Sequence, residues 1–305
     1  MTRTVLIAFA RLLITVLLAV TFVFVILRVS GDPARALLPV DAPEDQIAAV
    51  RTEWGLDKPL PEQYLTYVMK LASGDFGLSL NDRQPALRVV AEKIPATLLL
   101  MGTGLVIAFT VGSALGLLAA SYRGRAPDRL IMSLAIFVHS IPSFLFGILL
   151  ILLLAVALRL LPSGGGPSLL HLVMPAAVIG LSQAGVVARF VRSSTLEVLA
   201  QPYITVASLK PLPRWYFIRA HVLPGSALPL LTLFGFSLGG IIAGAAIVES
   251  VFAWPGVGRF LVFSVARRDV AVVQTIVVLV ATMMAFANLA TDLLYAIFDP
   301  RLRTS

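Results

Sequence analysis

Side chains that commonly carry enzyme chemistry are scarce in this sequence of 305 residues. Cysteine is absent, which excludes thiolate nucleophiles, disulfide bonds and cysteine-ligated zinc. His139, His171 and His221 lie on separate segments, and no two of them have the spacing of metal ligands. Gly164-Gly-Gly166 has no following lysine, so it indicates a flexible turn rather than a phosphate-binding loop. We therefore expect no catalytic site, metal site or bound cofactor.

The composition indicates a membrane protein. Hydrophobic residues make up 58% of the chain and charged residues 13%, against about 25% charged residues in a soluble domain. Six apolar stretches are each long enough for one crossing of about 20 residues. They cover 4–27, 94–122, 130–158, 160–188, 220–248 and 270–291, the fourth and fifth trimmed by proline and glycine to 169–188 and 230–248. We expect an all-α membrane protein with six transmembrane helices.

Charged residues divide unequally between the two sides of the membrane. Six crossings place both termini on one side, together with the loops 123–129 and 189–219. That side carries 12 Lys and Arg against 3 Asp and Glu, a net charge of +9, whereas the other side carries 12 of each. Because basic residues collect in cytoplasmic loops, we expect cytoplasmic termini. The sequence contains no basic soluble module of the kind that binds nucleic acid.

One acidic residue, Asp292, falls within an expected membrane helix, just past the charge-free stretch 270–291 and near a cytoplasmic end, where it can reach the headgroups. Ion-driven carriers usually hold a carboxylate near the midplane, where a charge costs at least about 2.5–3.5 kcal/mol. An ion-coupled secondary transporter is therefore the weaker interpretation. A membrane enzyme is also disfavoured, since no triad or intramembrane acid pair occurs.

Two segments between the spans are long enough to fold. Segment 31–93 holds 10 of the 16 acidic residues, and its apolar spacing predicts helices over 45–54 and 62–72. We call it the lobe, and two helices favour a docking surface over a passive connector. In segment 189–229, Pro202 suits the start of a helix. If this helix continues the preceding one, Tyr203, Val206 and Lys210 share a face with Leu196 and Leu199. This pattern fits a helix lying on anionic lipid and a helix docking on a partner equally well.

Three smaller features concern the spans themselves. His139 and Ser140 precede Pro142, which disrupts the third span, so they could line a pathway, although a hydrogen-bonded packing histidine is the commoner case. The pair Gly112 and Gly116 has the four-residue spacing that lets membrane helices approach closely. After the fifth span, Phe252 and Trp254 fit the aromatic belt at a membrane surface.

Several segments together resemble one family. They are Gly31-Asp-Pro33, Leu56-Asp-Lys-Pro-Leu-Pro-Glu-Gln-Tyr64, Gly74-Asp-Phe-Gly-Leu-Ser79, Ile94-Pro-Ala-Thr97, Val248-Glu-Ser-Val-Phe252, Trp254-Pro-Gly-Val-Gly-Arg259, Asp292-Leu-Leu-Tyr295 and Asp299-Pro-Arg301. In this order and at these spacings they are specific, and they run nearly from end to end. The chain resembles the integral-membrane permeases of bacterial ABC importers for dipeptides, oligopeptides and nickel.

This resemblance implies a type I ABC importer permease fold. It divides the chain into an N-terminal transmembrane helix (1–30), a small helical extracytoplasmic lobe (31–93), a permease core with five transmembrane helices (94–298) and a cytoplasmic tail (299–305). Within the core, 196–229 looks like the family's coupling loop, a short helix that docks in a groove of the ATP-binding subunit. The resemblance thus favours partner docking over lipid binding for this segment.

The resemblance also assigns positions within the coupling loop and the outside turn. The coupling positions are Glu197, Tyr203, Ala207, Lys210, Pro211, Leu212, His221 and Pro229. The turn positions are Glu249, Trp254, Pro255, Gly256 and Gly258. The sequence departs from the family where Pro211 replaces a usual glycine and where a usual asparagine is replaced around Gly225. Proline keeps the helix stop but cannot adopt a left-handed backbone.

The implied mechanism is alternating access in a bacterial inner membrane. A substrate-binding protein would deliver solute to a pathway formed by this chain and a second, homologous permease. Two ATP-binding subunits would use ATP-Mg, so this lipid-embedded chain would be non-catalytic and bind no cofactor or nucleic acid. Di- and oligopeptides are the expected solutes. Nickel, metallophores and glutathione are the alternatives, because their permeases share these motifs.

Overall fold

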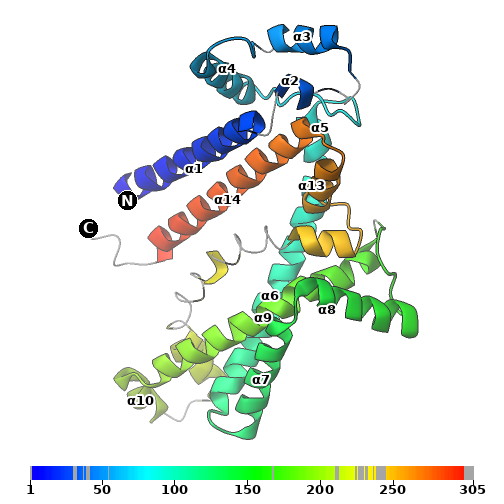
Figure 1. The fold of residues 1–305 in the computed structure, drawn as a ribbon. Helices are drawn as coiled ribbons and strands as arrows, with labels where there is room; N and C mark the ends of the chain where they lie inside the picture. Colours follow the sequence, from blue (N-terminus) through cyan, green and yellow to red (C-terminus); the bar gives the residue numbers. More distant parts are fainter. Residues whose placement is uncertain are drawn as a thin grey trace. The chain divides into compact units, whose positions relative to one another are not determined.

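The computed structural model describes residues 2–29, 33–36, 38, 42–53, 55–166, 168–209, 213–223, 225, 230, 233–235, 237 and 245–298. Within these ranges the regular structure is helical, apart from one isolated antiparallel bridge between Leu78 and Pro85. The all-α class expected from the sequence is confirmed (Figure 1). The chain forms two compact units, one of residues 2–97 with 255–289 and one of residues 98–254 with 290–305.

Among the described residues, four helices are long and apolar enough to cross a membrane, and one bent helix pair is a fifth candidate. The four are α1 (Thr2–Val29), α6 (Ile94–Ser121) together with the short helix before it, α9 (Leu169–Leu199) and α14 (Val270–Phe298). These and the bent pair coincide with five of the six expected crossings. The other expected crossing, 230–248, lies mostly outside the described residues, although 245–251 are helical.

The third crossing changes direction sharply. α7 (Ala126–Ser140) is followed by α8 (Ser143–Leu150) and the π-helical segment η1 (Ile151–Ala157), at an angle of 100°. Ile141 and Pro142 between them have extended backbone, with ψ of 123° and 136°. Proline disfavours a helical conformation in the residue before it. The sequence therefore indicates the break, whereas the direction of the second half depends on its packing.

Glycines let α6 and α9 pack closely in the unit containing residues 98–254. A Cβ atom added at Gly112 would lie 2.6 Å from Val187 Cβ, and one added at Gly116 would lie 2.6 Å from Ala188 O. Both distances are well below van der Waals contact, so any side chain would push the helices apart. The close approach expected for this glycine pair is confirmed, and it occurs within the chain.

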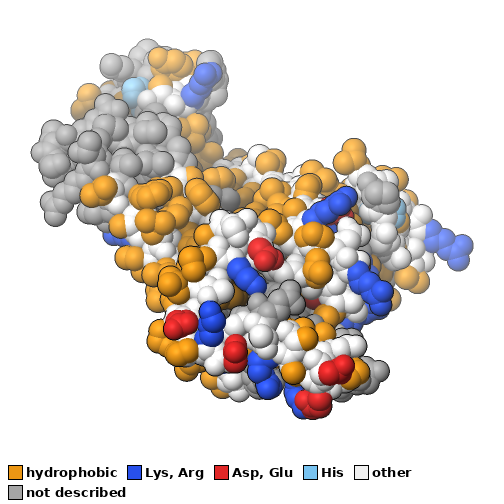
Figure 2. Space-filling model, turned by 90° about the horizontal axis from the view of Figure 1, so that it is seen from above, with side chains coloured by type: hydrophobic (Ala, Val, Ile, Leu, Met, Phe, Trp, Pro, Cys, Tyr) orange, Lys and Arg blue, Asp and Glu red, His pale blue; other side chains and the backbone are white. Residues whose placement is uncertain are grey.

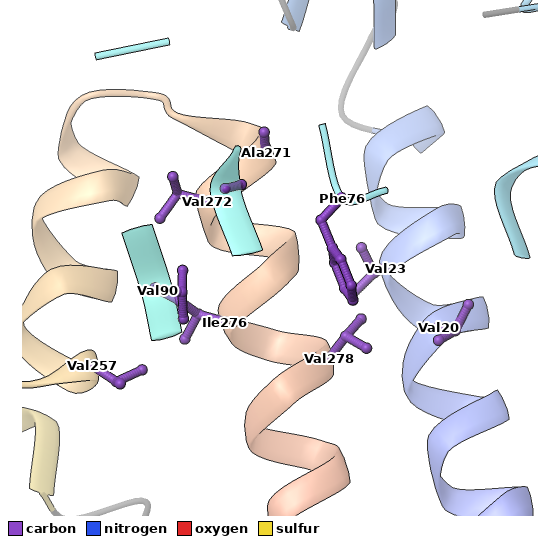
Figure 3. Close-up of a cluster of buried hydrophobic side chains, with 10 residues drawn as sticks. Val20, Val23, Phe76, Val90, Val257, Ala271, Val272, Ile276 and Val278 are labelled. Carbon is purple, nitrogen blue, oxygen red and sulfur yellow. The ribbon is translucent and has the colours of Figure 1, made fainter. Parts of the chain in front are cut away.

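The second unit contains the lobe and is built around one apolar core. The lobe helices are α2 (Pro33–Ala36), α3 (Glu44–Glu53), α4 (Leu60–Ala72) and α5 (Ala86–Ala91), and α13 (Val257–Ala266) precedes α14. The two lobe helices predicted from apolar spacing correspond to α3 and α4. Figure 3 shows Phe76 of the lobe close to Val23 of α1 and Val278 of α14. Packing of these side chains joins the lobe to α1 and α14.

Polar contacts join α1 to α4. Thr21 Oγ1 and Tyr64 Oη are 2.7 Å apart, and Arg28 donates from Nη2 to Gln63 Oε1 at 2.8 Å. Burial raises the pKa of Tyr67 to about 12, against the opposing effect of Arg28. Tyr67 therefore keeps its proton at neutral pH. The lobe is thus attached to the first helix by several side chains.

Asp269 attaches the lobe to the start of α14. Its Oδ2 accepts hydrogen bonds from Ser79 Oγ at 2.6 Å and from Asn81 Nδ2 at 3.1 Å. Its Oδ1 lies 3.3 Å from the backbone N of Val272, in the position of a helix N-cap. Asp269 is 1% exposed, so this clasp is shielded from water.

Two further contacts explain sequence segments that carried the family resemblance. Gln274 Nε2 donates to the carbonyl of Phe76 at 2.9 Å, which holds the 74–79 segment against α14. The backbone N of Val257 donates to Thr97 Oγ1 at 2.8 Å, which holds the start of α13 against the start of the second span. Both motifs therefore have structural roles within one unit.

The described surface is apolar along α1 and mixed in charge over the lobe. Leu13, Leu17 and Phe22 of α1 are exposed, as expected for a helix that faces lipid or another membrane subunit. In the lobe, acidic and basic residues are exposed together. Figure 2 shows such side chains interspersed on the face seen from above.

Candidate functional site

A short separate helix follows the end of α9. α10 (Pro202–Ser208) begins with Pro202 in its first turn, as expected. Gln201, between the two helices, has extended backbone with φ −75° and ψ 141°. Because the helices are not continuous, the condition for Tyr203 and Val206 to share a face with Leu196 and Leu199 of α9 is not met.

α10 is anchored by one face and presents the other. Ile204 is buried in a cluster with Val198 of α9 and Val222 of the π-helical segment η2 (Ile218–Val222), which follows α11 (Arg214–Phe217). On the presented face, the exposed fractions are 52% for Tyr203, 63% for Val206 and 81% for Leu209. This arrangement gives a fixed helix with an outward aromatic and aliphatic surface.

The structure describes four of the eight coupling positions. Glu197 and Tyr203 are exposed, whereas Ala207 of α10 is buried. His221 is half-buried, with its ring 5.8 Å from that of Phe217. The other four, Lys210, Pro211, Leu212 and Pro229, lie outside the described residues.

Gly225 stands where the family resemblance led us to expect asparagine. A Cβ atom added there would lie 3.0 Å from Val198 Cγ2 and 3.3 Å from Tyr203 Oη. These distances leave little room for a side chain, because α10 packs against this position. The departure from the family pattern therefore matches the local packing.

An ion pair that the sequence did not reveal lies near this segment. Arg192 of α9 donates from Nε to Asp128 Oδ1 at 2.6 Å and from Nη2 to Asp128 Oδ2 at 2.8 Å. Asp128 is the single acidic residue in a stretch that contains Arg123, Arg125 and Arg129. That isolation is the one sequence signal that could have marked it, since a lone carboxylate among arginines suggests a pairing role.

The turn after the fifth expected crossing is buried. The exposed fraction is 0% for Glu249, 1% for Phe252 and 4% for Trp254, and Trp254 N donates to Glu249 O at 2.8 Å. The expectation that Phe252 and Trp254 form part of an aromatic belt is therefore wrong, because their side chains fill the interior instead. Of the other predicted turn residues, Gly256 precedes α13 as its N-cap, Gly258 lies in the first turn of α13, and Pro255 is exposed.

The glycine-rich loop packs against this same turn. Gly165 N donates to the carbonyl of Phe252 at 3.0 Å. Gly164 has φ +153°, and an added Cβ atom would collide with the same carbonyl oxygen. The prediction of a flexible turn is therefore wrong. The turn packs tightly, and a side chain at Gly164 has no space.

His139 and Ser140 lie immediately before the bend of the third crossing. His139 Nδ1 is 3.0 Å from the carbonyl oxygen of Ser182 on α9 and therefore acts as the donor, while the side chain remains exposed. Ser140 Oγ donates to the carbonyl of Ile136 one turn earlier, and Pro142 is exposed. These contacts fit the packing interpretation, and the exposure fits a pathway position.

Metal chemistry finds no support in the described part of the chain. It contains no group of three His, Asp or Glu side chains placed to hold a metal ion. His171 Nδ1 is 2.7 Å from Ser168 Oγ, which is a local contact at the start of α9.

Two family models match this chain. The model described as binding-protein-dependent transport system inner membrane component matches residues 112–304. The model for the N-terminal part of such membrane components matches residues 1–101. Together they match residues 1–101 and 112–304, which are nearly the whole chain.

Curated proteins and a solved structure agree with this family. The glutathione transport system permease protein GsiC of Salmonella paratyphi A is 38% identical over 290 residues, which cover 95% of each chain. GsiC of Escherichia coli K12 is 38% identical over 273 residues, 90% of this chain and 89% of the relative. A chain of the inward-facing MetNI methionine ABC transporter has a similar fold, with a TM-score of 0.60 and 19% identity over 70% of this chain and 98% of that one. The chain therefore belongs to the family of binding-protein-dependent transport system inner membrane components, as a multi-pass, non-catalytic ABC importer permease.

Proposed function

We propose that this permease imports short peptides, with the tripeptide glutathione among its substrates. The relatives at 38% identity over most of the chain are named as glutathione permeases. The peptide branch was also the first expectation from the sequence motifs. The proposed pathway lies between this chain and a second, homologous permease, and an extracytoplasmic binding protein delivers the solute.

The outward face of α10 is the observation that carries the mechanism. Tyr203, Val206 and Leu209 are exposed on a helix whose opposite face is anchored to α9 and η2. An apolar and aromatic surface held in this way suits a groove on a folded partner. We assign this face to one of two ATP-binding subunits, which hydrolyse ATP-Mg, and we place it in the cytoplasm with both termini.

Substitutions on this face test the assignment. In proteoliposomes containing the whole transporter, Tyr203→Asp or Lys210→Glu should lower uptake per ATP hydrolysed at least about tenfold. The first substitution adds a charge to the docking face and the second reverses one, and both should weaken docking on the ATP-binding subunit. Tyr203→Phe keeps the ring and should retain most of the coupling. If both charged variants transport normally, the docking role of α10 is wrong. Uptake that continues without any ATP-binding subunit would instead support a secondary transporter.

The substrate assignment needs its own experiment. Proteoliposomes with the cognate binding protein are supplied with labelled glutathione, a labelled dipeptide or Ni²⁺, each in turn. We expect saturable, ATP-dependent uptake of glutathione or the dipeptide. Uptake of Ni²⁺ alone would contradict the peptide assignment and favour the metal branch of the family.

We further propose that His139, Ser140 and Pro142 face the transport pathway at the bend of the third crossing. An exposed imidazole directed at lipid would be unfavourable, which leaves a water-filled path or a second permease as its surroundings. Because the chain has no cysteine, His139→Cys gives a unique thiol. Modification by a charged thiol reagent, slowed by substrate during turnover, is the expected result. Complete resistance in every nucleotide state would refute the pathway position.

A further inference from the structure

Asp128 and Arg192 join two helices although they are 64 residues apart in the sequence. Both carboxylate oxygens are used, at 2.6 and 2.8 Å from two guanidinium nitrogens. The Asp128 side chain is 4% exposed and that of Arg192 29% exposed. This paired geometry fixes both distance and orientation, which the single ammonium of a lysine would not do. The start of α7 is therefore held to α9 in one defined arrangement.

The same carboxylate also holds the turn before α7. The backbone N of Gly124 donates to Asp128 Oδ2 at 2.8 Å. Gly124 has φ +73°, a left-handed conformation that glycine adopts without strain. One side chain thus connects α9, the first turn of α7 and the turn of residues 122–125.

α9 links this ion pair to α10. Arg192 precedes Val198 by six positions, about 9 Å along a helix, and Val198 packs against Ile204 of α10. α9 is continuous over Leu169–Leu199, and Val191 beside Arg192 is buried. A displacement of α10 therefore reaches Arg192 through one stiff helix.

Stability alone is a weak reason for such a pair. Desolvation of two charges offsets much of their attraction, and an apolar replacement of similar volume is often neutral or stabilising. The property that an apolar contact lacks is fixed orientation. We propose that Asp128 and Arg192 are positioning residues that transmit movement of α10 to α7 and to the turn 122–125. This inference rests on the proposed function, because it concerns the coupling of ATP hydrolysis to import.

Single substitutions test the transmission. In the reconstituted transporter, Asp128→Asn and Arg192→Lys should each reduce uptake per ATP hydrolysed at least about fivefold, while the assembled complex retains its ATPase subunits. Arg189→Lys is the matched control, because Arg189 is an exposed arginine one turn away on the same helix. Unchanged coupling in assembled Asp128→Asn and Arg192→Lys complexes would overturn the proposal, as would an equal loss in Arg189→Lys.

A double substitution separates transmission from stability. Asp128→Leu combined with Arg192→Met replaces the ion pair by an apolar contact. We expect the double variant to assemble as the unsubstituted transporter does, while its uptake per ATP hydrolysed stays low. Normal uptake per ATP hydrolysed in the double variant would show that the pair only stabilises the fold.

A third measurement compares the helix spacing with the pair intact and with the pair broken. Spin labels on Arg129→Cys and Arg189→Cys report the distance between α7 and α9 in the ATP-bound and ATP-free complex. With the pair present we expect one narrow distance in both states, and with Asp128→Asn a broader distribution. A shift between states in the intact pair would contradict transmission. Absence of any ATP-driven uptake by the unsubstituted transporter would refute the proposed function instead.

Discussion

Asp269 combines three contacts in one buried carboxylate. It caps α14 and accepts hydrogen bonds from Ser79 and Asn81 of the lobe. A buried acceptor serving several donors is costly to remove, because each donor then lacks a partner. The attachment of the lobe to the last membrane helix therefore depends strongly on this residue.

We expect Asp269→Ala to loosen the lobe by about 2–4 kcal/mol, the sum of a lost cap and unsatisfied buried donors. Limited proteolysis of the purified protein measures this directly, with faster cleavage near residues 79–85. Asp57→Ala removes an exposed carboxylate from the same lobe and should leave the cleavage rate unchanged. Equal cleavage rates for both variants would show that the clasp is unimportant.

Single residues were predictable where a motif marked them. Phe76 and Thr97 belong to segments that carried the family resemblance, and both make defined contacts. The Asp128–Arg192 pair was not predicted, because counting charges by side of the membrane does not indicate which charges meet. The burial of Phe252 and Trp254 was missed for a related reason. Aromatic residues suit both a membrane surface and a packed interior, and only the surrounding chain decides between them.

The close packing of α6 against α9 depends on glycine. Gly112 and Gly116 place the backbone of α6 against Val187 and Ala188 of α9. In a membrane, such packing replaces the hydrophobic driving force available in water. The pair is a rigid support for the segment that ends in α10.

A matched pair of alanine substitutions on α6 tests this packing. Gly116→Ala should destabilise the solubilised protein by about 1–3 kcal/mol through overpacking, seen as a lower thermal aggregation temperature. Gly102→Ala meets no atom within 4 Å and should be neutral or slightly stabilising, by up to about 1 kcal/mol. A similar effect of both substitutions would indicate that the close approach is not limiting.

Elements were predicted best where apolar length and proline agree. The expected starts of the spans at 94, 169 and 270 coincide with α6, α9 and α14. The 100° bend after α7 was not predictable, since Pro142 removes a hydrogen-bond donor without specifying a direction. Pro202 marked the start of α10, but whether α9 and α10 are continuous stayed open, because residue spacing does not show that the backbone of Gln201 is extended.

For the whole molecule, the charge distribution predicts which face meets the cytoplasm. The proposed inner side has a net charge of +9, and the outer side has a net charge of zero. Most large exposed side chains on α1 are apolar, which fits a membrane-embedded helix. Substrate choice was the least predictable property, because related permeases share these motifs and the solute is first selected by a separate protein.

Single cysteines in this cysteine-free chain can test the orientation. Lys58→Cys in the lobe and Arg125→Cys in the loop before α7 are both exposed positions. In intact spheroplasts, a membrane-impermeant maleimide should label Lys58→Cys, whereas Arg125→Cys should react after permeabilisation. The reverse pattern would invert the topology, and labelling of both in intact cells would contradict the assigned crossings.

The contacts between the lobe and α14 also bear on how the protein is made. Phe76 and Gln274, which are joined by a hydrogen bond, are 198 residues apart. At about 5–20 residues per second of synthesis, the lobe emerges roughly 10–40 seconds before its partner helix exists. During that interval its apolar face is uncovered, so the ribosome must deliver nearly the whole chain before this half can mature. A nascent chain that stalls before residue 270 would therefore contain the lobe without α14, and its uncovered apolar face would be a target for quality-control proteases.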